Sequence, residues 1–249
     1  MLLIDAHTHL DDKQFSDIDD VIVRAKDAGV KRIVTNGIDV ASNRKALALA
    51  DKYDIVLPAL GLYPIEATKM SADAIDEEIA FIRSKRDAII SIGEIGIDEH
   101  WLRDKVGEMV GPFRKMIALA KELEKPITVH SRDAEERTIE VLEEEDAKNV
   151  IMHCFGGGKK LVKRILDNGW YLTIPTSVVY DGHFQWIVEM APLSRILTET
   201  DAPYLGPVRG ERNEPAFIKA AVEKIAEIKK MVPEEAANII FKNYMEVFG

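Results

Sequence analysis

Short apolar runs alternate with longer amphipathic stretches along the whole chain. The runs have strand length, and the stretches between them repeat apolar residues at the three- and four-residue spacing of one helix face. We predict strands at residues 2–7, 32–36, 55–60, 88–94, 126–130, 150–153, 170–176 and 196–200. We predict helices at residues 17–28, 42–52, 72–84, 111–123, 133–144, 159–168, 182–190 and 215–230, with a further helix at 233–247. Eight strands alternating with eight helices predict an α/β fold, a parallel (β/α)8 TIM barrel with an extra C-terminal helix.

The length and composition favour one domain. The 249 residues match the usual size of one TIM barrel, and no linker rich in Pro, Gly or Ser divides them. We therefore expect a single domain over residues 1–249. Hydrophobic residues make up 47% of the chain, which allows a large core, but the longest apolar stretches are shorter than a membrane span. Because the chain opens directly on a predicted strand, we expect no signal peptide and no membrane association.

The chain has one cysteine, Cys154, so an internal disulfide is excluded. A single thiol fits the reducing cytoplasm, where we place the protein. Because Cys154 directly follows His153, its side chain should point away from that of His153. A buried apolar thiol is therefore the favoured interpretation over a metal ligand.

The formal net charge of −10 argues against binding along intact duplex DNA, which depends on a basic surface. A site that holds divalent cations can nevertheless be locally positive and attract an anionic substrate. The charge therefore limits the mode of nucleic-acid binding without excluding it.

Histidines and carboxylates recur at the downstream ends of the apolar runs. A lone histidine after a strand is more often a hydrogen-bonded core residue than a ligand. Here four of the six histidines share this position, and chemistry on a TIM barrel is found at that end of the strands. His7 and His9, two residues apart on one strand, point to the same side and can chelate one ion. The predicted metal ligands are His7, His9, Glu94, His130, His153 and Asp201.

Two of these residues are also predicted to be catalytic. A carboxylate at Glu94 can bridge two cations that polarise the same water, as in two-metal phosphoesterases. Asp201 can bind one ion and accept the proton of that water. The alternative for Asp201 is a carboxylate that only caps the turn after its strand.

The motifs that contain these residues occur in a consistent order over nearly the whole chain. They are His7-Thr8-His9-Leu10-Asp11, Gly-Glu-x-Gly-x-Asp at 93–98, His130-Ser131-Arg132-Asp133-Ala134, His153-Cys154-Phe155-Gly156-Gly157, Glu199-Thr200-Asp201-Ala202-Pro203-Tyr204-Leu205 and Arg212-Asn213-Glu214-Pro215. In this combination the sequence resembles the TatD-type DNases, a branch of the amidohydrolase superfamily.

The resemblance implies two divalent metal ions, magnesium, manganese or zinc, that activate a hydroxide to hydrolyse phosphodiester bonds of DNA, often from the 3′ end. It assigns His7, His9, Glu94 and Asp201 to the first ion. It assigns Glu94, His130 and His153 to the second. The imidazole-rich set suits transition metals better than magnesium, which prefers oxygen ligands.

The chain departs from the family where Gly61-Leu62-Tyr63-Pro64 replaces the usual Gly-x-His-Pro. The resemblance implies that the imidazole at this position contacts the substrate phosphate, so we predict that Tyr63 binds substrate. A phenol donates one hydrogen bond but carries no positive charge at neutral pH.

Further substrate contacts are predicted near the metal ligands. Arg132, two positions after His130, can fork onto a phosphate. Lys159 and Lys160 open a helix after three glycines, where free amides favour an anion, although a solvated lysine pair is an equal alternative. Trp101 and Tyr204 can stack on bases, or pack against the core.

The leading hypothesis is a DNase that acts on single-stranded or frayed DNA ends, because a barrel rim admits a splayed strand more readily than a duplex. We expect a monomer or weak oligomer. A second hypothesis is metal-dependent acyl or ester hydrolysis, including aminoacyl-tRNA deacylation. A third is a non-catalytic binder of phosphates or nucleic-acid ends, which has little need for so complete a ligand set.

Overall fold

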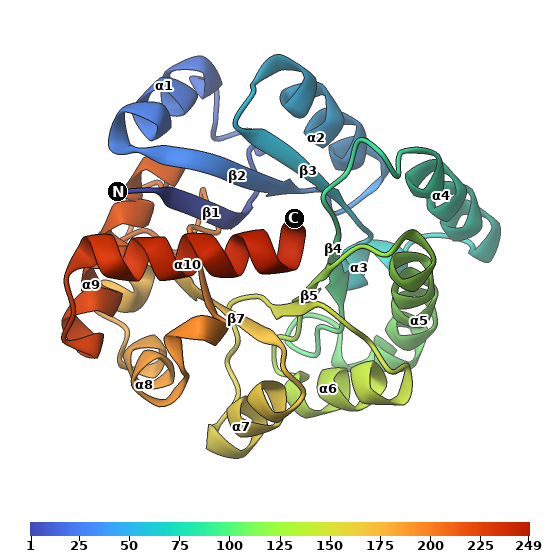
Figure 1. Ribbon diagram of the computed structural model, residues 1–249. Coiled ribbons are helices and arrows are strands. Elements are labelled where there is room, and N and C mark those ends of the chain that lie inside the picture. Colours follow the sequence, from blue (N-terminus) through green and yellow to red (C-terminus); the bar gives the residue numbers. More distant parts are fainter. The chain divides into compact units, whose positions relative to one another are not determined.

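The computed structural model describes residues 1–249, and its eight strands form one parallel sheet in sequence order, from β1 to β8 (Figure 1). The strands are β1 (Leu3–Thr8), β2 (Val30–Asn36), β3 (Val56–Leu60), β4 (Ser91–Gly96), β5 (Ile127–His130), β6 (Val150–Met152), β7 (Tyr171–Pro175) and β8 (Ile196–Glu199). Helices alternate with these strands, so the predicted TIM barrel is confirmed.

The α-helices are α1 (Ile18–Ala28), α2 (Val40–Lys52), α3 (Pro64–Ala67), α4 (Ala72–Ser84), α5 (Val106–Leu123), α6 (Glu135–Glu144), α7 (Lys159–Asp167), α8 (Gly182–Met190), α9 (Ile218–Lys229) and α10 (Pro233–Phe248). Short 3-10 helices are η1 (Arg103–Lys105), η2 (Thr176–Val179), η3 (Leu193–Arg195) and η4 (Pro215–Phe217). The extra C-terminal helix is α10, as predicted. None of the helices combines the length and the apolar character that crossing a membrane requires.

Local capping explains why several helix ends were predictable. Ser71 accepts a hydrogen bond from the Ala74 amide (3.2 Å) and begins α4, and Asp181 accepts one from the His183 amide (2.9 Å) and begins α8. Gly29 ends α1 in the left-handed conformation, with φ of 96°. Each cap satisfies backbone groups that a helix end leaves without an intrahelical partner.

Most elements differ from their predicted bounds by one residue or more, and β4 and α5 show the physical reason. Strand β4 begins and ends later than predicted because its pairing with β3 starts at Ser91, while its pairing with β5 continues to Gly96. Helix α5 begins at Val106, where a start near 111 was expected, and contains Pro112. Proline is favoured in a first helical turn, so Pro112 suggested that the helix begins near residue 111. The helix begins earlier because Val106 and Met109 are buried on its first turn. The single-turn helix α3 was not predicted.

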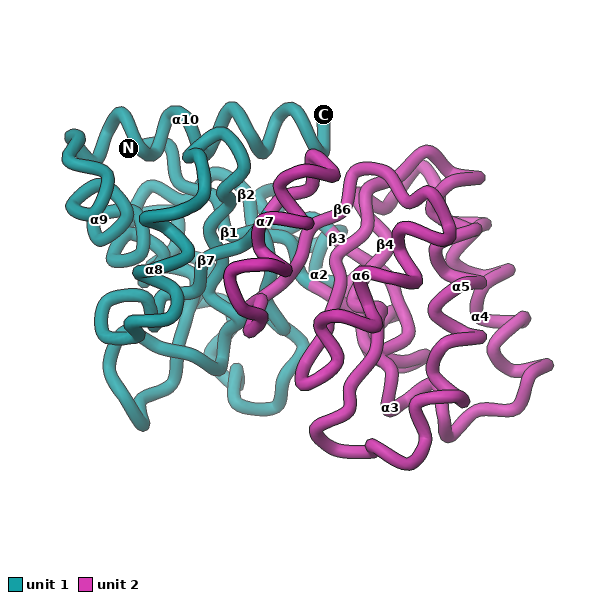
Figure 2. The backbone as a smooth tube through the Cα atoms, turned by 90° about the horizontal axis from the view of Figure 1, so that it is seen from below, with its two compact units in different colours: residues 1–35, 49–57, 172–249 teal, residues 36–48, 58–171 magenta.

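The chain divides into two compact units, coloured separately in Figure 2. Unit 1 consists of residues 1–35, 49–57 and 172–249. Within it, helix α10 packs against β1, β8 and α9. The first and last strands of the chain are joined through side chains as well, because Thr198 Oγ1 donates to the carbonyl of Ile4 at 3.0 Å. Unit 1 therefore brings the two ends of the sequence together.

Unit 2 consists of residues 36–48 and 58–171. Helix α5 packs against β4 and against α3, α4 and α6. The fully buried side chains that α5 contributes include Met109, Phe113 and Met116. The expectation of one domain stays a prediction, since each unit has its own densely packed interior.

Glycines let neighbouring backbones of unit 2 approach closely beside Glu94 and His130. A Cβ atom added to Gly61 would lie 2.5 Å from the carbonyl carbon of Gly93. A Cβ added to Gly96 would lie 2.0 Å from the carbonyl oxygen of His130, and Gly96 has a φ of 145°, which side chains disfavour. These glycines fix how near β3, β4 and β5 come to one another.

The Gly96→Ala substitution is expected to lower the free energy of unfolding by about 2–4 kcal/mol, because it adds both a clash and an unfavourable φ. Chemical denaturation measures this change. Gly107→Ala is the matched control, because nothing lies within 4 Å of its added methyl group on α5. That control should change stability by less than about 1 kcal/mol. Equal stability of the two variants would contradict the packing argument.

Candidate metal centres

Three predicted ligands meet in unit 1, at the end of β1 and just beyond the end of β8. His7 Nε2 lies 3.2 Å from His9 Nε2, and Asp201 Oδ1 lies 3.5 Å from the first nitrogen and 3.4 Å from the second. His7 is fully buried, while His9 and Asp201 keep 14% of their side-chain surface exposed. The triad therefore presents two nitrogens and one oxygen within bonding reach of a single cation, at a place that solvent can reach.

Backbone hydrogen bonds hold this triad. The Asp201 amide donates to the carbonyl of His7 at 2.9 Å, and the His9 amide donates to the carbonyl of Ala202 at 2.8 Å. Asp201 has a φ of 54°, so the chain turns sharply where β8 ends. The two segments thus pair beyond the regular strands, which places the carboxylate beside both imidazoles.

Asp5, a buried residue that the motif analysis did not single out, supports the same triad. Its Oδ1 accepts from the Thr200 amide at 2.8 Å, and its Oδ2 accepts from the Thr200 hydroxyl at 2.5 Å. Burial raises the pKa of Asp5 well above its ordinary value, against the opposing effect of the Thr200 hydrogen bonds. Asp5 therefore fixes the residue before Asp201 while its own carboxyl group is satisfied.

The other three predicted ligands meet in unit 2. His130 Nδ1 lies 2.9 Å from Glu94 Oε1, and His153 Nε2 lies 4.0 Å from the same oxygen. The two imidazole rings are 6.2 Å apart with an angle of 30° between their planes. Glu94 and His153 are buried and His130 is nearly so. This second triad also has its donor atoms within reach of one cation.

Asp98 determines which nitrogen of His130 is available. His130 Nε2 lies 2.8 Å from Asp98 Oδ2, and the phenol of Tyr63 donates to the same oxygen at 2.6 Å. Burial opposes ionisation of Asp98, but these hydrogen bonds prevail and lower its pKa to about 2. An ionised carboxylate only accepts hydrogen bonds, so Nε2 carries a proton and Nδ1 is the nitrogen that faces Glu94.

The environment of His130 favours a positive charge. Burial lowers its pKa, yet the hydrogen bonds with Asp98 and Glu94 outweigh burial and leave the pKa raised. A metal ion bound there takes the place of that proton. A carboxylate that orients the imidazole of a metal ligand is a common arrangement in metalloproteins.

The chemistry of the two donor sets fits divalent metal ions. Each triad contains two imidazoles and one carboxylate. The negative carboxylate compensates the positive charge of a bound cation, which would be costly to bury without a partner. Imidazole and carboxylate together suit zinc, manganese and related ions. Metal binding by the individual residues stays a prediction, and the geometry within each triad agrees with it.

The predicted substrate contacts lie on exposed loops and a helix start. In unit 2, the Arg132 guanidinium lies 5.5 Å from the centre of the Trp101 ring, and Trp101 is 63% exposed. Lys159 and Lys160 are exposed at the start of α7, whose preceding residue makes no side-chain cap. In unit 1, the Tyr204 hydroxyl donates to Asp12 at 3.1 Å. None of these placements conflicts with binding an anionic strand.

Tyr63 has a partner that the sequence did not indicate. Its phenol is committed to Asp98, and burial raises its pKa above the ordinary value, so it is a neutral donor. Its prediction as a substrate contact remains, but the hydrogen bond adds a supporting role for His130. The signal for this role was the last residue of the Gly-Glu-x-Gly-x-Asp motif, Asp98.

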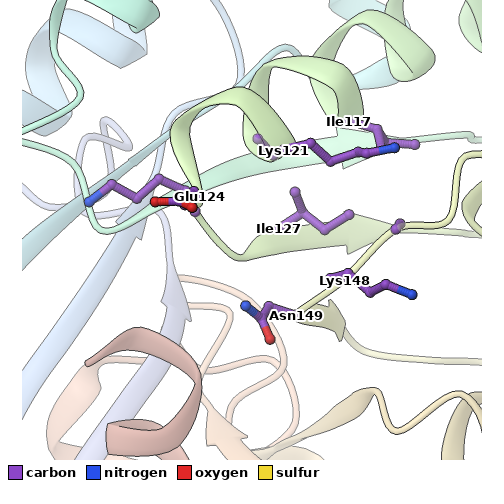
Figure 3. A pocket seen from close by; sticks show the side chains of 9 residues that line it. Ile117, Lys121, Glu124, Ile127, Lys148 and Asn149 are labelled. Carbon is purple, nitrogen blue, oxygen red and sulfur yellow. The ribbon is translucent and has the colours of Figure 1, made fainter.

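Figure 3 shows a pocket in unit 2, of about 370 Å³, whose lining contains none of these ligands. It lies at the starts of β5 and β6, whereas His130 and His153 are at or beyond their ends. Two of its three lysines are engaged, because Lys121 donates to the carbonyl of Glu145 and Lys148 pairs with Asp146. We therefore assign this pocket no part in the metal chemistry.

The sequence and fold match known proteins over nearly their whole length. The family model for TatD related DNase matches residues 4–249. The uncharacterized metal-dependent hydrolase YabD of Bacillus subtilis is 37% identical, with 99% of both chains covered. Human deoxyribonuclease TATDN3 is 33% identical over 99% of this chain and 94% of its own. The crystal structure of YjjV, a TatD homologue from Escherichia coli, has a TM-score of 0.92 at 26% identity and covers 99% of this chain and 97% of its own.

The Glu94→Gln variant is expected to lose the ion held with His130 and His153, because a neutral amide removes the negative charge of that triad. Metal content per chain, measured by mass spectrometry after dialysis, should fall by at least about one ion, because Glu94 is also predicted to bridge to the ion held by His7, His9 and Asp201. Glu108→Gln is the matched control, since Glu108 is exposed and pairs only with Lys105. Unchanged metal content in Glu94→Gln would exclude Glu94 as a ligand.

The Tyr63→Phe variant is expected to weaken metal binding in unit 2 about tenfold, the usual scale for losing a residue that orients a ligand. Competition with a coloured chelator measures the affinity. Tyr53→Phe is the control, because its phenol also donates to a carboxylate at 2.6 Å, that of Asp19 on α1. If both variants bind metal as the wild type does, Tyr63 has no influence on the ligand His130.

Proposed function

Because the chain belongs to the TatD related DNase family of metal-dependent hydrolases, we propose that it hydrolyses phosphodiester bonds at single-stranded or frayed ends of DNA. The observation that carries this proposal is the pair of triads, each with two imidazoles and one carboxylate. A protein that only binds nucleic-acid ends has no need for two such sets of donors. Turnover is therefore favoured over binding alone.

The proposal gives each triad one divalent ion, with zinc or manganese preferred over magnesium because of the imidazoles. Ions in such sites stabilise negative charge on a phosphoryl group and make water more acidic. Asp201, partly open to solvent, accepts the proton of the attacking water at its carboxylate. Arg132 binds a phosphate of the strand with its exposed guanidinium.

The net charge supports ends over intact duplex as the substrate. A chain with a net charge of −10 lacks the excess of basic residues that a protein uses to follow duplex DNA. A strand end needs only local contacts, for which Arg132, Lys159 and Lys160 are exposed. We place the protein in the cytoplasm, as a monomer or weak oligomer, on the same sequence arguments as above.

Acyl-ester hydrolysis is the second candidate, and Tyr63 is the observation that favours it. The family's imidazole at this position could become positively charged and support a phosphate, whereas the phenol of Tyr63 is neutral. The ester group of an aminoacyl-tRNA is neutral, whereas a phosphodiester group carries a negative charge. A less positive site is then sufficient.

A panel of labelled substrates tests the proposed function. Single-stranded DNA with a 3′ or a 5′ label, the same sequence as RNA, and an aminoacyl-tRNA are incubated with zinc-, manganese- or magnesium-loaded protein. We expect DNA to be shortened progressively from one end and the aminoacyl ester to remain intact. The label that is released first gives the polarity.

Asp201→Asn controls for contaminating nucleases in this panel. The variant should lower kcat by about a hundredfold or more, the scale of losing a general base, with a smaller change in KM. Hydrolysis of the aminoacyl ester without cleavage of DNA would replace the proposed function by the second candidate. Equal DNA cleavage by wild type and Asp201→Asn would contradict the proposed role of Asp201 as the general base. It would also mean that the observed cleavage is no evidence for catalysis at this site.

A further inference from the structure

A second pocket, of about 420 Å³, lies in unit 1 beside the triad of His7, His9 and Asp201. Three loops form it, one each after β1, β7 and β8. The first contributes Gln14, the second contributes Tyr180, and the third contributes residues 203–206 and 208–212. Neither the metal ligands nor the predicted phosphate contacts of the barrel line it, and Tyr204 is the one lining residue that the sequence analysis predicts to bind substrate.

The pocket offers flat surfaces to a ligand. Tyr204 is 50% exposed and Tyr180 is 37% exposed, although both are large aromatic residues that would otherwise be buried. The Arg209 guanidinium lies 4.6 Å from the centre of the Tyr180 ring, which gives a second planar group in contact with the first. A planar ligand can stack on such surfaces whatever its edge carries.

The charge of the pocket argues for a neutral ligand. Arg212 is committed to Asp17 through two hydrogen bonds of 2.5 and 2.9 Å, and Arg209, which lies against Tyr180, is the other cation of the lining. Glu211 lines the same pocket, and Asp12 accepts the hydroxyl of Tyr204. One guanidinium among these carboxylates makes a poor site for a bare phosphate. A neutral heteroaromatic ring fits better.

The pocket is held in shape by one buried amide. Asn213 Nδ2 lies 2.7 Å from the carbonyls of Thr200 and Tyr204 and 2.9 Å from Thr176 Oγ1. Thr176 in turn donates to the carbonyl of Leu205 at 2.8 Å. The loops after β7 and β8 are thereby tied to each other. A ligand would find the surfaces already in place, which lowers the entropic cost of binding.

The same loop connects the pocket to the metal ligands. The Tyr204 amide donates to the carbonyl of Asp201 at 2.8 Å. The Tyr204 ring centre lies 6.5 Å from that of His9. One nucleotide of an extended strand is roughly as long as two extended amino-acid residues, about 7 Å. A group stacked on Tyr204 therefore lies about one nucleotide from the triad.

We propose that this pocket is a nucleobase subsite, in which Tyr180, Tyr204 and Arg209 stack on the base of a nucleotide next to the bond that is cleaved. The inference rests on the proposed action on DNA and adds how the strand is gripped. Because stacking uses the face of the base, the subsite accepts all four bases. It also requires an unpaired strand, since a base within a duplex has both faces covered.

The test is an abasic scan of strand binding. Short single-stranded oligonucleotides carry one abasic residue at each position in turn, with phosphorothioate linkages that slow turnover. Affinity for the metal-loaded protein is measured by fluorescence anisotropy. One abasic position should weaken binding to the wild type about tenfold, the scale of one stacked base. In Tyr180→Ala and Tyr204→Leu the same abasic residue should cost less, because part of the stacking surface is already gone.

Matched variants separate stacking from folding and from charge. Tyr180→Phe keeps the ring and loses only the hydroxyl's bond to Gly206, so the abasic penalty should persist. Arg209→Ala should reduce the penalty, whereas Lys219→Ala removes an exposed cation that pairs with Glu223 on α9 and should leave it intact. Thermal unfolding of every variant confirms that the fold is retained.

Two outcomes overturn the inference. In one, no abasic position weakens binding to the wild type; in the other, the penalty is the same in Tyr180→Ala, Tyr204→Leu and the wild type. Failure of the proposed function is seen separately, as absence of cleavage of unmodified DNA. An abasic penalty that Tyr180→Ala reduces supports the subsite even in a protein that does not cleave DNA. Normal cleavage without any penalty rejects the subsite alone.

Discussion

The hydrogen bonds of Asp5 with Thr200 are the interaction on which the site in unit 1 depends. These hydrogen bonds join residues 195 positions apart, and the carboxyl group of Asp5 that accepts them is buried. Burying a carboxyl group without partners is costly, so it is tolerated only because the Thr200 amide and hydroxyl satisfy it. The backbone then pairs in both directions between the end of β1 and residues 201–202. Ligands from the two ends of the chain meet as a consequence of this closure.

A different constraint governs unit 2, where small residues set the distances between strands. Gly61 and Gly96 permit backbone contacts that any side chain would prevent, next to Glu94 and His130. The approach leaves little room for adjustment, so the orientation of His130 has to come from hydrogen bonds. Asp98 supplies it and is itself held by Tyr63. The glycines thus allow the close packing of the strands, and this packing places Asp98 where it sets the tautomer of His130.

The sequence was sufficient for the fold because its elements carry local signals. Helices α4 and α8 have the predicted bounds, and both begin at a capping side chain that can be recognised without knowledge of the fold. The ligands were identified because histidines and carboxylates repeat at strand ends. Asp5 and Asn213 were missed as supporting residues, since their partners are backbone groups on distant segments. No local pattern distinguishes a buried asparagine that ties two loops from one that lies in a turn.

The departure at position 63 is best understood through Asp98. A charged imidazole at that position would place a second cation beside this carboxylate and compete with His130 for its negative charge. The neutral phenol donates a hydrogen bond without adding charge, so Asp98 keeps its net negative charge while Tyr63 and His130 share one of its oxygens. A stronger interaction with Asp98 increases the electron density of the imidazole and its affinity for a metal ion. The substitution thus exchanges a possible contact with substrate charge for firmer support of a ligand, and the donor set of the triad is unchanged.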